Sequence, residues 1–111
     1  AFRAAAVWLG DRDILPVERV AVPPGWRHDD PRVAVTGLDN CFDGWDGVVT
    51  LKDTVLDVQL QSGLSRLVVF TNATRDTVAI EPVSHVNNAV NLLKEGVSDA
   101  QVLGLTETLF R

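Results

Sequence analysis

The sequence predicts an all-β protein, an antiparallel β-sandwich, on three observations. Apolar and polar residues alternate over residues 56–61, a period of two that is typical of a strand with one buried face. Short apolar runs recur along the chain between clusters of Gly, Pro, Asp and Asn, which favour turns. A helical pattern is confined to residues 88–95. Short strands separated by turns in this way favour an antiparallel sandwich.

The N-terminal half contains two weak strand signals. Val20 and Val22 indicate one alternating strand, and Val33 and Val35 indicate a second. The segment 23–25, with sequence PPG, breaks regular structure and predicts a turn between them.

The signals are stronger after residue 55. The strand at 56–61 places Leu56, Val58 and Leu60 on one face, which we expect to be the buried one. Its polar residues then lie on the solvent side, so the strand is predicted to be half-buried.

The following segments predict a hairpin and a helix. Residues 66–70 form a short apolar run, as in a more fully buried strand, and residues 77–80 form the next strand. The polar stretch 72–76 between them is the predicted hairpin loop. Residues 88–95 are the one helical candidate, and Gly96 is expected to cap it.

Length, charge and cysteine content limit the class of function. The 111 residues are the size of one domain, so we expect residues 1–111 to form a single domain or a fragment of one. A net charge of −5 disfavours nucleic acid and anionic membranes as partners, because both require a basic face. No segment approaches the roughly 18 consecutive apolar residues of a membrane span. Cys41 is the single cysteine, and one Cys with two His lacks metal-ligand spacing, so we expect neither an internal disulfide nor a metal site.

Glu81 is the most informative of the polar residues predicted to lie at strand ends or turns. It follows a predicted strand directly, precedes Pro82, and by alternation shares a face with Ala79, opposite Val78 and Ile80. A carboxylate at such a boundary is expected to be partly desolvated, which strengthens it as a general base. The alternative is an ordinary solvated Glu at a strand end. The other polar groups in comparable positions are Asp39, Asn40, Asn87 and Asn88.

The histidines and tryptophans are weaker candidates. His85 lies four residues after Glu81 and is either an acid–base partner or a surface group, whereas His28 lies in a charged run and is a poor candidate for chemistry. Trp8 is expected in the core. Trp45 lies in a turn-rich segment, where we expect a position at the rim of a site.

Two segments together resemble the galactose mutarotase (aldose 1-epimerase) superfamily. Residues 38–47, LDNCFDGWDG, resemble that family's LDNxFxGWxG segment. Residues 79–91, AIEPVSHVNNAVN, preceded by the strand 68–71, look like its closing strands with their VEPVSHxxNAxN signature. The resemblance covers roughly residues 10–93, and the second motif is the more specific of the two.

The resemblance implies that these residues are the C-terminal part of a β-supersandwich, and that the protein is a cytoplasmic isomerase that interconverts the α and β anomers of a hexose. At the matching positions, Glu81 is the general base on the C1 hydroxyl and Asp39 hydrogen-bonds sugar hydroxyls. Asn40, Trp45 and His85 are weaker candidates for lining the substrate site. Such a reaction needs a base and an acid but no cofactor.

The resemblance also implies that the general-acid histidine lies in an N-terminal half to which none of these residues corresponds. Two other functions therefore stay open: a carbohydrate-binding module without catalysis, and a structural fragment that completes its sheet by association. In the last case we expect a homo-oligomer, or pairing with the missing half, because edge strands lack partners.

Overall fold

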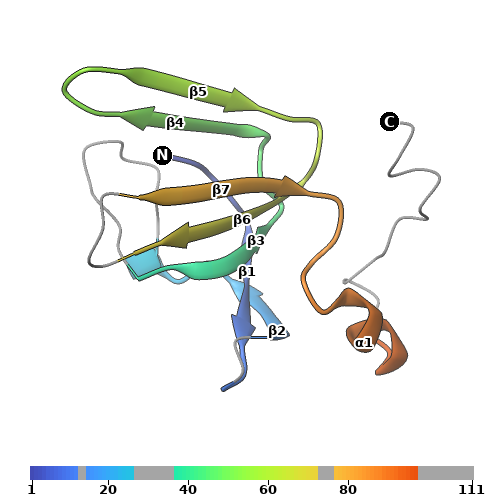
Figure 1. Ribbon diagram of the computed structural model, residues 1–111. Coiled ribbons are helices and arrows are strands. Elements are labelled where there is room, and N and C mark those ends of the chain that lie inside the picture. Colours follow the sequence, from blue (N-terminus) through green and yellow to red (C-terminus); the bar gives the residue numbers. More distant parts are fainter. Residues whose placement is uncertain (13–14, 27–36, 73–76, 98–111) are drawn as a thin grey trace.

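The computed structural model describes residues 1–12, 15–26, 37–72 and 77–97, which fold into two antiparallel sheets (Figure 1). The larger sheet has the strand order β2-β1-β3-β6-β7, and the smaller one is the hairpin β4-β5. The elements are β1 Ala6–Gly10, β2 Pro16–Ala21, a 3-10 turn Pro24–Trp26, β3 Asp39–Asp43, β4 Val48–Lys52, β5 Asp57–Gln61, β6 Arg66–Thr71, β7 Val78–Val83 and α1 Ala89–Lys94. The all-β, antiparallel sandwich-like class expected from the sequence is confirmed.

The strongest sequence signals correspond to observed elements. The runs at 56–61, 66–70 and 77–80 are β5, β6 and β7, and β6 pairs with β7 as the predicted hairpin. The alternation at Val20 falls in β2. The strand predicted at 33–35 lies outside the described residues, as do 73–76 of the predicted hairpin loop.

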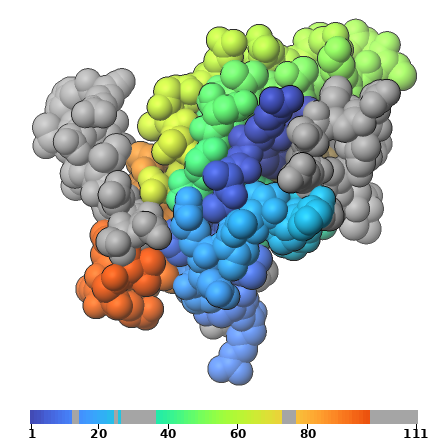
Figure 2. All heavy atoms as spheres, turned by 180° about the vertical axis from the view of Figure 1, so that it is seen from behind, coloured from blue at the N-terminus to red at the C-terminus, as the bar shows by residue number. Residues whose placement is uncertain are grey.

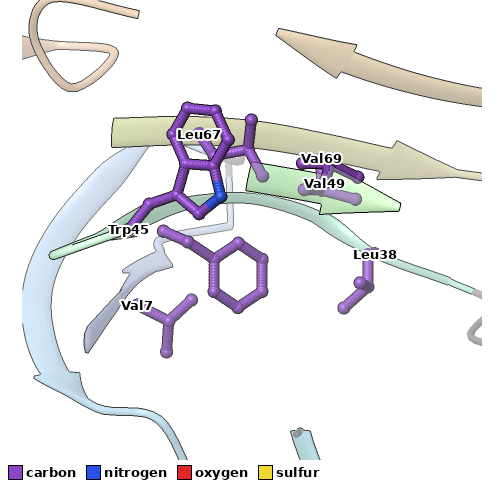
Figure 3. Close-up of a cluster of buried hydrophobic side chains, with 7 residues drawn as sticks. Val7, Leu38, Trp45, Val49, Leu67 and Val69 are labelled. Atoms are coloured by element: carbon purple, nitrogen blue, oxygen red, sulfur yellow. The ribbon is translucent and has the colours of Figure 1, made fainter. Parts of the chain in front are cut away.

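The main core fills the space between the larger sheet and the β4-β5 hairpin, which lies at the top of Figure 1. Its buried side chains come from both layers, as Figure 3 shows: Val7, Leu38, Phe42, Trp45, Val49, Leu67 and Val69. Phe2 packs its ring edge-on against Phe42, with centroids 4.9 Å apart, and bridges to Val49 of β4. The N-terminal residues thereby join the hairpin to the larger sheet.

The β5 strand is less buried than its alternation predicted. Leu60 packs against the main core, but Val58 is 43% exposed and Leu56 is 61% exposed. The pairs Val49–Leu60 and Leu51–Val58 show that both apolar residues face the core side. The outer end of the hairpin therefore has the predicted orientation, but no element among the described residues packs beneath it to bury it.

A second, smaller core lies under α1 on the other face of the larger sheet. Ala89 and Leu92 of α1 pack with Val86 against Trp8 and Cys41. Figure 2 shows α1 beside the N-terminal strands, where the Asn88 side-chain amide donates to the carbonyl of Pro16 over 3.1 Å. The expected burial of Trp8 is confirmed at 1% exposure.

Gly96 ends α1, as predicted. Its φ of +85° is a left-handed conformation that suits glycine, and its N–H donates to the Leu93 carbonyl over 3.1 Å. Val97 N–H donates to the Leu92 carbonyl over 2.9 Å, and the Val97 side chain packs against the second core. These are the two hydrogen bonds and the apolar contact of a Schellman motif.

The prediction that the strand 77–80 ends before Glu81 and Pro82 is wrong. The strand β7 continues through Pro82, which pairs with Leu67, to Val83. Within the described part of the chain β7 is an edge of the larger sheet, and an edge strand tolerates proline at a position whose nitrogen faces away from the neighbouring strand. Glu81 therefore lies inside a strand rather than after one.

Candidate functional site

The candidate residues are organised by the register of β3, β6 and β7. Cross-strand partners in a sheet point to the same face, and alternate residues along a strand do so too. Three rows therefore share one face of the larger sheet, which we call the Glu81 face: Asp39–Phe70–Ala79, Cys41–Val68–Glu81 and Asp43–Arg66–Val83.

The Glu81 face is covered at one end and open at the other. Asp43 and Cys41 are 7% and 2% exposed, because Trp8 and the α1 cluster lie over them. Asp39, which begins β3 two residues before Cys41, is exposed. On β6 the exposed fraction rises to 40% at Phe70. The row through Val68 is the boundary, since Val68 packs against the second core whereas Glu81 is exposed.

Glu81 and Asp39 both lie on the open part of this face. They belong to β7 and β3, which are separated by β6 alone. Two strand spacings and one two-residue step put their Cα atoms roughly 12 Å apart. The partial desolvation expected for Glu81 is not observed. The cluster under α1 covers the neighbouring Val68 but does not extend to Glu81, whose side chain is exposed.

Asn40 occupies a different environment from its neighbour Asp39. Its side-chain amide donates to the Trp8 carbonyl over 3.0 Å, and its Oδ1 accepts from the Asp39 N–H at 3.3 Å. The amide group is therefore used to join β3 to β1, and alternation directs Asn40 away from the Glu81 face.

The rim position expected for Trp45 is wrong. Trp45 is 4% exposed and lies in the main core (Figure 3), with its indole N–H donating to the Val48 carbonyl over 3.0 Å. The turn-rich sequence around it forms a tight connection between β3 and β4 that folds the indole inward. The main core is on the opposite side of the larger sheet from Glu81.

His85 follows β7 and is half-buried. Its Nδ1 lies 2.8 Å from the Ser84 hydroxyl oxygen, so the adjacent serine orients the imidazole. Asn87 is exposed before α1, and Asn88 holds the start of α1 to β2 as described above. His28 lies outside the described residues.

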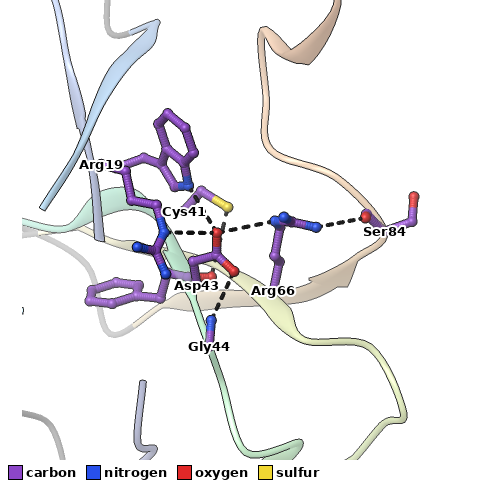
Figure 4. A network of polar contacts seen from close by, with 8 residues as sticks. Arg19, Cys41, Asp43, Gly44, Arg66 and Ser84 are labelled. Carbon is purple, nitrogen blue, oxygen red and sulfur yellow. Dashed lines mark hydrogen bonds and ion pairs between the residues drawn. The ribbon is translucent and has the colours of Figure 1, made fainter. Parts of the chain in front are cut away.

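A buried charge network beside the site was not found from the sequence. Asp43 Oδ2 accepts from Arg19 Nε at 3.3 Å and from the Trp8 indole at 3.4 Å, and Oδ1 accepts from the Gly44 N–H at 2.8 Å (Figure 4). Arg66 Nε forms an ion pair with Oδ2 at 3.3 Å.

This network joins the strands that carry the candidate site. Besides its ion pair with Asp43, Arg66 donates through a terminal nitrogen to the Ser84 carbonyl over 3.2 Å (Figure 4). A carboxylate on β3 is thus linked through β6 to the end of β7. Asp43 followed by Gly44 is a sequence typical of a turn, and no local signal marks a carboxylate that is buried by residues from distant strands.

Cys41 lies beside this network and is unreactive by environment. Burial, reinforced by the nearby negative charge of Asp43, raises the pKa of its thiol from 9.0 to about 12. The thiol is consequently protonated at neutral pH and is a weak nucleophile.

The remaining features of the described segments do not contribute to a site on the Glu81 face. A hollow of about 140 Å³ lies near the N-terminus, lined by Ala1, Phe2, Arg3, Asp46, Val48 and Thr50. Among residues 1–12, 15–26, 37–72 and 77–97, no three His, Cys, Asp or Glu side chains gather as metal ligands would. In the same ranges, no helix has the length and apolar character to cross a membrane.

Comparisons of the chain with protein-family models, with curated proteins and with solved structures find no match.

Proposed function

We propose that this chain supplies the general base and a sugar-binding carboxylate of an aldose 1-epimerase-like isomerase that acts on a hexose. The observation that carries the proposal is the placement of Asp39 and Glu81 on the same open sheet face, with one strand between them. The two residues come from the two segments that resemble the galactose mutarotase superfamily. A cytoplasmic location is part of the same proposal.

Each residue has a defined role in the proposed reaction. The Glu81 carboxylate accepts the proton of the C1 hydroxyl, and the C1 carbonyl forms as the bond from C1 to the ring oxygen breaks. The ring oxygen takes up a proton from a general acid. Rotation about the bond between C1 and C2, followed by the reverse steps, gives the other anomer. A positioned proton-transfer group contributes about 10²–10⁴-fold to such a rate.

Asp39 binds rather than reacts. Its exposed carboxylate accepts hydrogen bonds from sugar hydroxyls, which fixes the ring with C1 toward β7. A separation of roughly 12 Å between the Cα atoms, reduced by the reach of both side chains, is suited to a hexose that spans from one to the other. We assign the general acid to a residue outside the described part of the chain, in the same molecule or in a second copy of this chain, so that the chain alone is sufficient for the reaction.

Anomer exchange of glucose and galactose, measured by NMR saturation transfer, tests the proposal. We expect exchange above the buffer rate in the wild-type chain and a return to the buffer rate in Glu81→Gln. Glu18→Gln, which alters another exposed strand glutamate, is the matched control and should keep the wild-type rate. Wild-type exchange at the buffer rate, or exchange that survives Glu81→Gln, contradicts the proposed catalytic role.

The alternatives give different results in the same samples. A carbohydrate-binding module binds hexose, as seen by saturation-transfer difference NMR, without accelerating exchange. A structural fragment binds no sugar and completes its sheet by association, which light scattering after size-exclusion chromatography detects. The edge strands of the described sheet, β2 and β7, are where such pairing would occur.

A further inference from the structure

Phe70 occupies an unusual position for an aromatic residue in the interior of a sheet. It lies on β6, with β3 on one side and β7 on the other, yet 40% of it is exposed. Neither of the two buried clusters formed by the described residues includes it. Its cross-strand neighbour on β7 is Ala79, whose small side chain leaves one side of the ring uncovered.

The register places this ring between the two candidate carboxylates. Phe70 is the direct cross-strand partner of Asp39, so their Cβ atoms are about 4.5–5.5 Å apart. Glu81 is its diagonal neighbour on β7, at about 7–8 Å. An exposed aromatic ring therefore forms the floor of the open part of the Glu81 face, with a carboxylate on each side.

These three groups match the chemistry of a pyranose. One side of such a ring is a patch of C–H groups, which contacts the electron-rich face of an aromatic ring, and its edge carries hydroxyl donors. The two carboxylates accept from those hydroxyls and repel a phosphate or carboxylate on the ligand. The combination favours an uncharged sugar over a phosphorylated one.

We propose that Phe70 is the stacking platform for the C–H face of an uncharged hexose, and that it holds the sugar ring between Asp39 and Glu81. The inference rests on the proposed function, because it names the third group of the same site. It adds a prediction about affinity and ligand charge that catalysis by Glu81 does not itself make.

Hexose binding to Phe70→Ala, Phe70→Tyr and the wild-type chain, followed by NMR titration, tests the role of the ring. Loss of an aromatic contact of 0.5–1.5 kcal/mol corresponds to a dissociation constant raised roughly two- to twelve-fold in Phe70→Ala. Phe70→Tyr keeps the ring and should bind as the wild type does. Upfield ring-current shifts of the sugar C–H protons should be present in the wild type and Phe70→Tyr and absent in Phe70→Ala. Glucose 6-phosphate should bind more weakly than glucose.

Val78→Ala is the matched control. Val78 is 41% exposed on β7, next to the strand of Phe70, and alternation places it on the opposite face from Glu81. Its truncation removes similar exposed apolar surface and should leave sugar binding unchanged. Circular dichroism of each variant establishes that the fold is retained.

The outcomes separate this inference from the proposed function. Wild-type exchange with equal sugar affinity in Phe70→Ala overturns the platform and leaves the isomerase proposal standing. Sugar binding that weakens in Phe70→Ala, without exchange in the wild type, supports the platform and overturns catalysis. Absence of both binding and exchange in the wild type overturns both.

Discussion

The Asp43 carboxylate and the Arg66 guanidinium form an ion pair between β3 and β6, with Oδ2 3.3 Å from Nε and both side chains about nine-tenths buried. Such a pair fixes the relative position of its strands, because removal of one charge leaves the other buried and uncompensated. The two strands and β7 carry every residue of the candidate site on the Glu81 face.

The first prediction concerns this pair. Asp43→Asn keeps the shape of the side chain but leaves Arg66 without its counter-charge, and we expect a loss of about 3–5 kcal/mol in the free energy of unfolding. Urea denaturation measures it. Asp57→Asn, at an exposed position on β5, should change stability by less than about 0.5 kcal/mol. Equal effects of the two substitutions would show that the buried pair contributes nothing.

The second prediction is a loss of stability at alkaline pH through Cys41. Burial raises the pKa of the folded-state thiol from 9.0 to about 12, so between these values the unfolded chain has lost a proton that the folded chain retains. Stability is therefore fully present below pH 9 and falls as the pH rises toward 12, by at most about 1.4 kcal/mol per pH unit.

Two measurements check the alkaline effect. The stability difference between the wild type and Cys41→Ala, from urea denaturation at several pH values, should shrink above pH 9. Thiolate absorbance should also appear only near pH 12 in the folded protein, and the sequence contains no tyrosine to obscure it. Thiolate formation near pH 9 without unfolding would contradict the burial of Cys41.

The third prediction compares two glycines with positive φ. Gly47 has φ of +88°, and a Cβ added there would lie 2.5 Å from the Ser62 carbonyl oxygen, whereas Gly37 has φ of +77° and open space around it. We expect Gly37→Ala to cost about 1–2 kcal/mol from the left-handed backbone alone. Gly47→Ala should lower the free energy of unfolding by more, because the turn must also shift to move the added Cβ away from the Ser62 carbonyl oxygen. Thermal unfolding of both variants checks the order, and a smaller loss for Gly47→Ala would refute it.

The fourth prediction concerns acid. Asp53 Oδ1 accepts from the N–H groups of Val55 and Leu56 at 2.7 and 2.6 Å, and these bonds lower the pKa of Asp53 below 3.8. The stabilisation is present above pH 3.8 and is lost as the pH falls through the lower, folded-state value. NMR titration of the Asp53 side chain measures the pKa directly. A value at or above 3.8 would mean that the turn between β4 and β5 does not depend on this carboxylate.

Periodicity predicted β5, β6 and β7 because each has a clear apolar pattern. It missed β4 as well as β1 and β3, and the last two were missed for different reasons. Residues 6–8 of β1 are buried on both faces, so alternation is lost. The sequence of β3, DNCFD, is rich in residues that favour turns, and its Asp43 is accommodated by arginines from β2 and β6.

The candidate site was predicted residue by residue but not as an arrangement. Glu81 and Asp39 were identified from two separate motifs, whereas their common face follows from the strand order β3-β6-β7. Phe70 was part of a predicted buried strand, and its exposure depends on where α1 stops covering the sheet. Both features come from pairings between segments that are distant in the sequence.

The position of β3 has a consequence for how the chain folds. The pairs β1-β2, β4-β5 and β6-β7 are hairpins between consecutive strands, whereas β3 pairs with β1 and β6, neither of which adjoins it in sequence. Local hairpins form quickly, and non-local pairing carries the larger loop-closure entropy. We therefore expect docking of β3 to set the folding rate, and the face that carries Asp39 and Glu81 to form only when that step is complete.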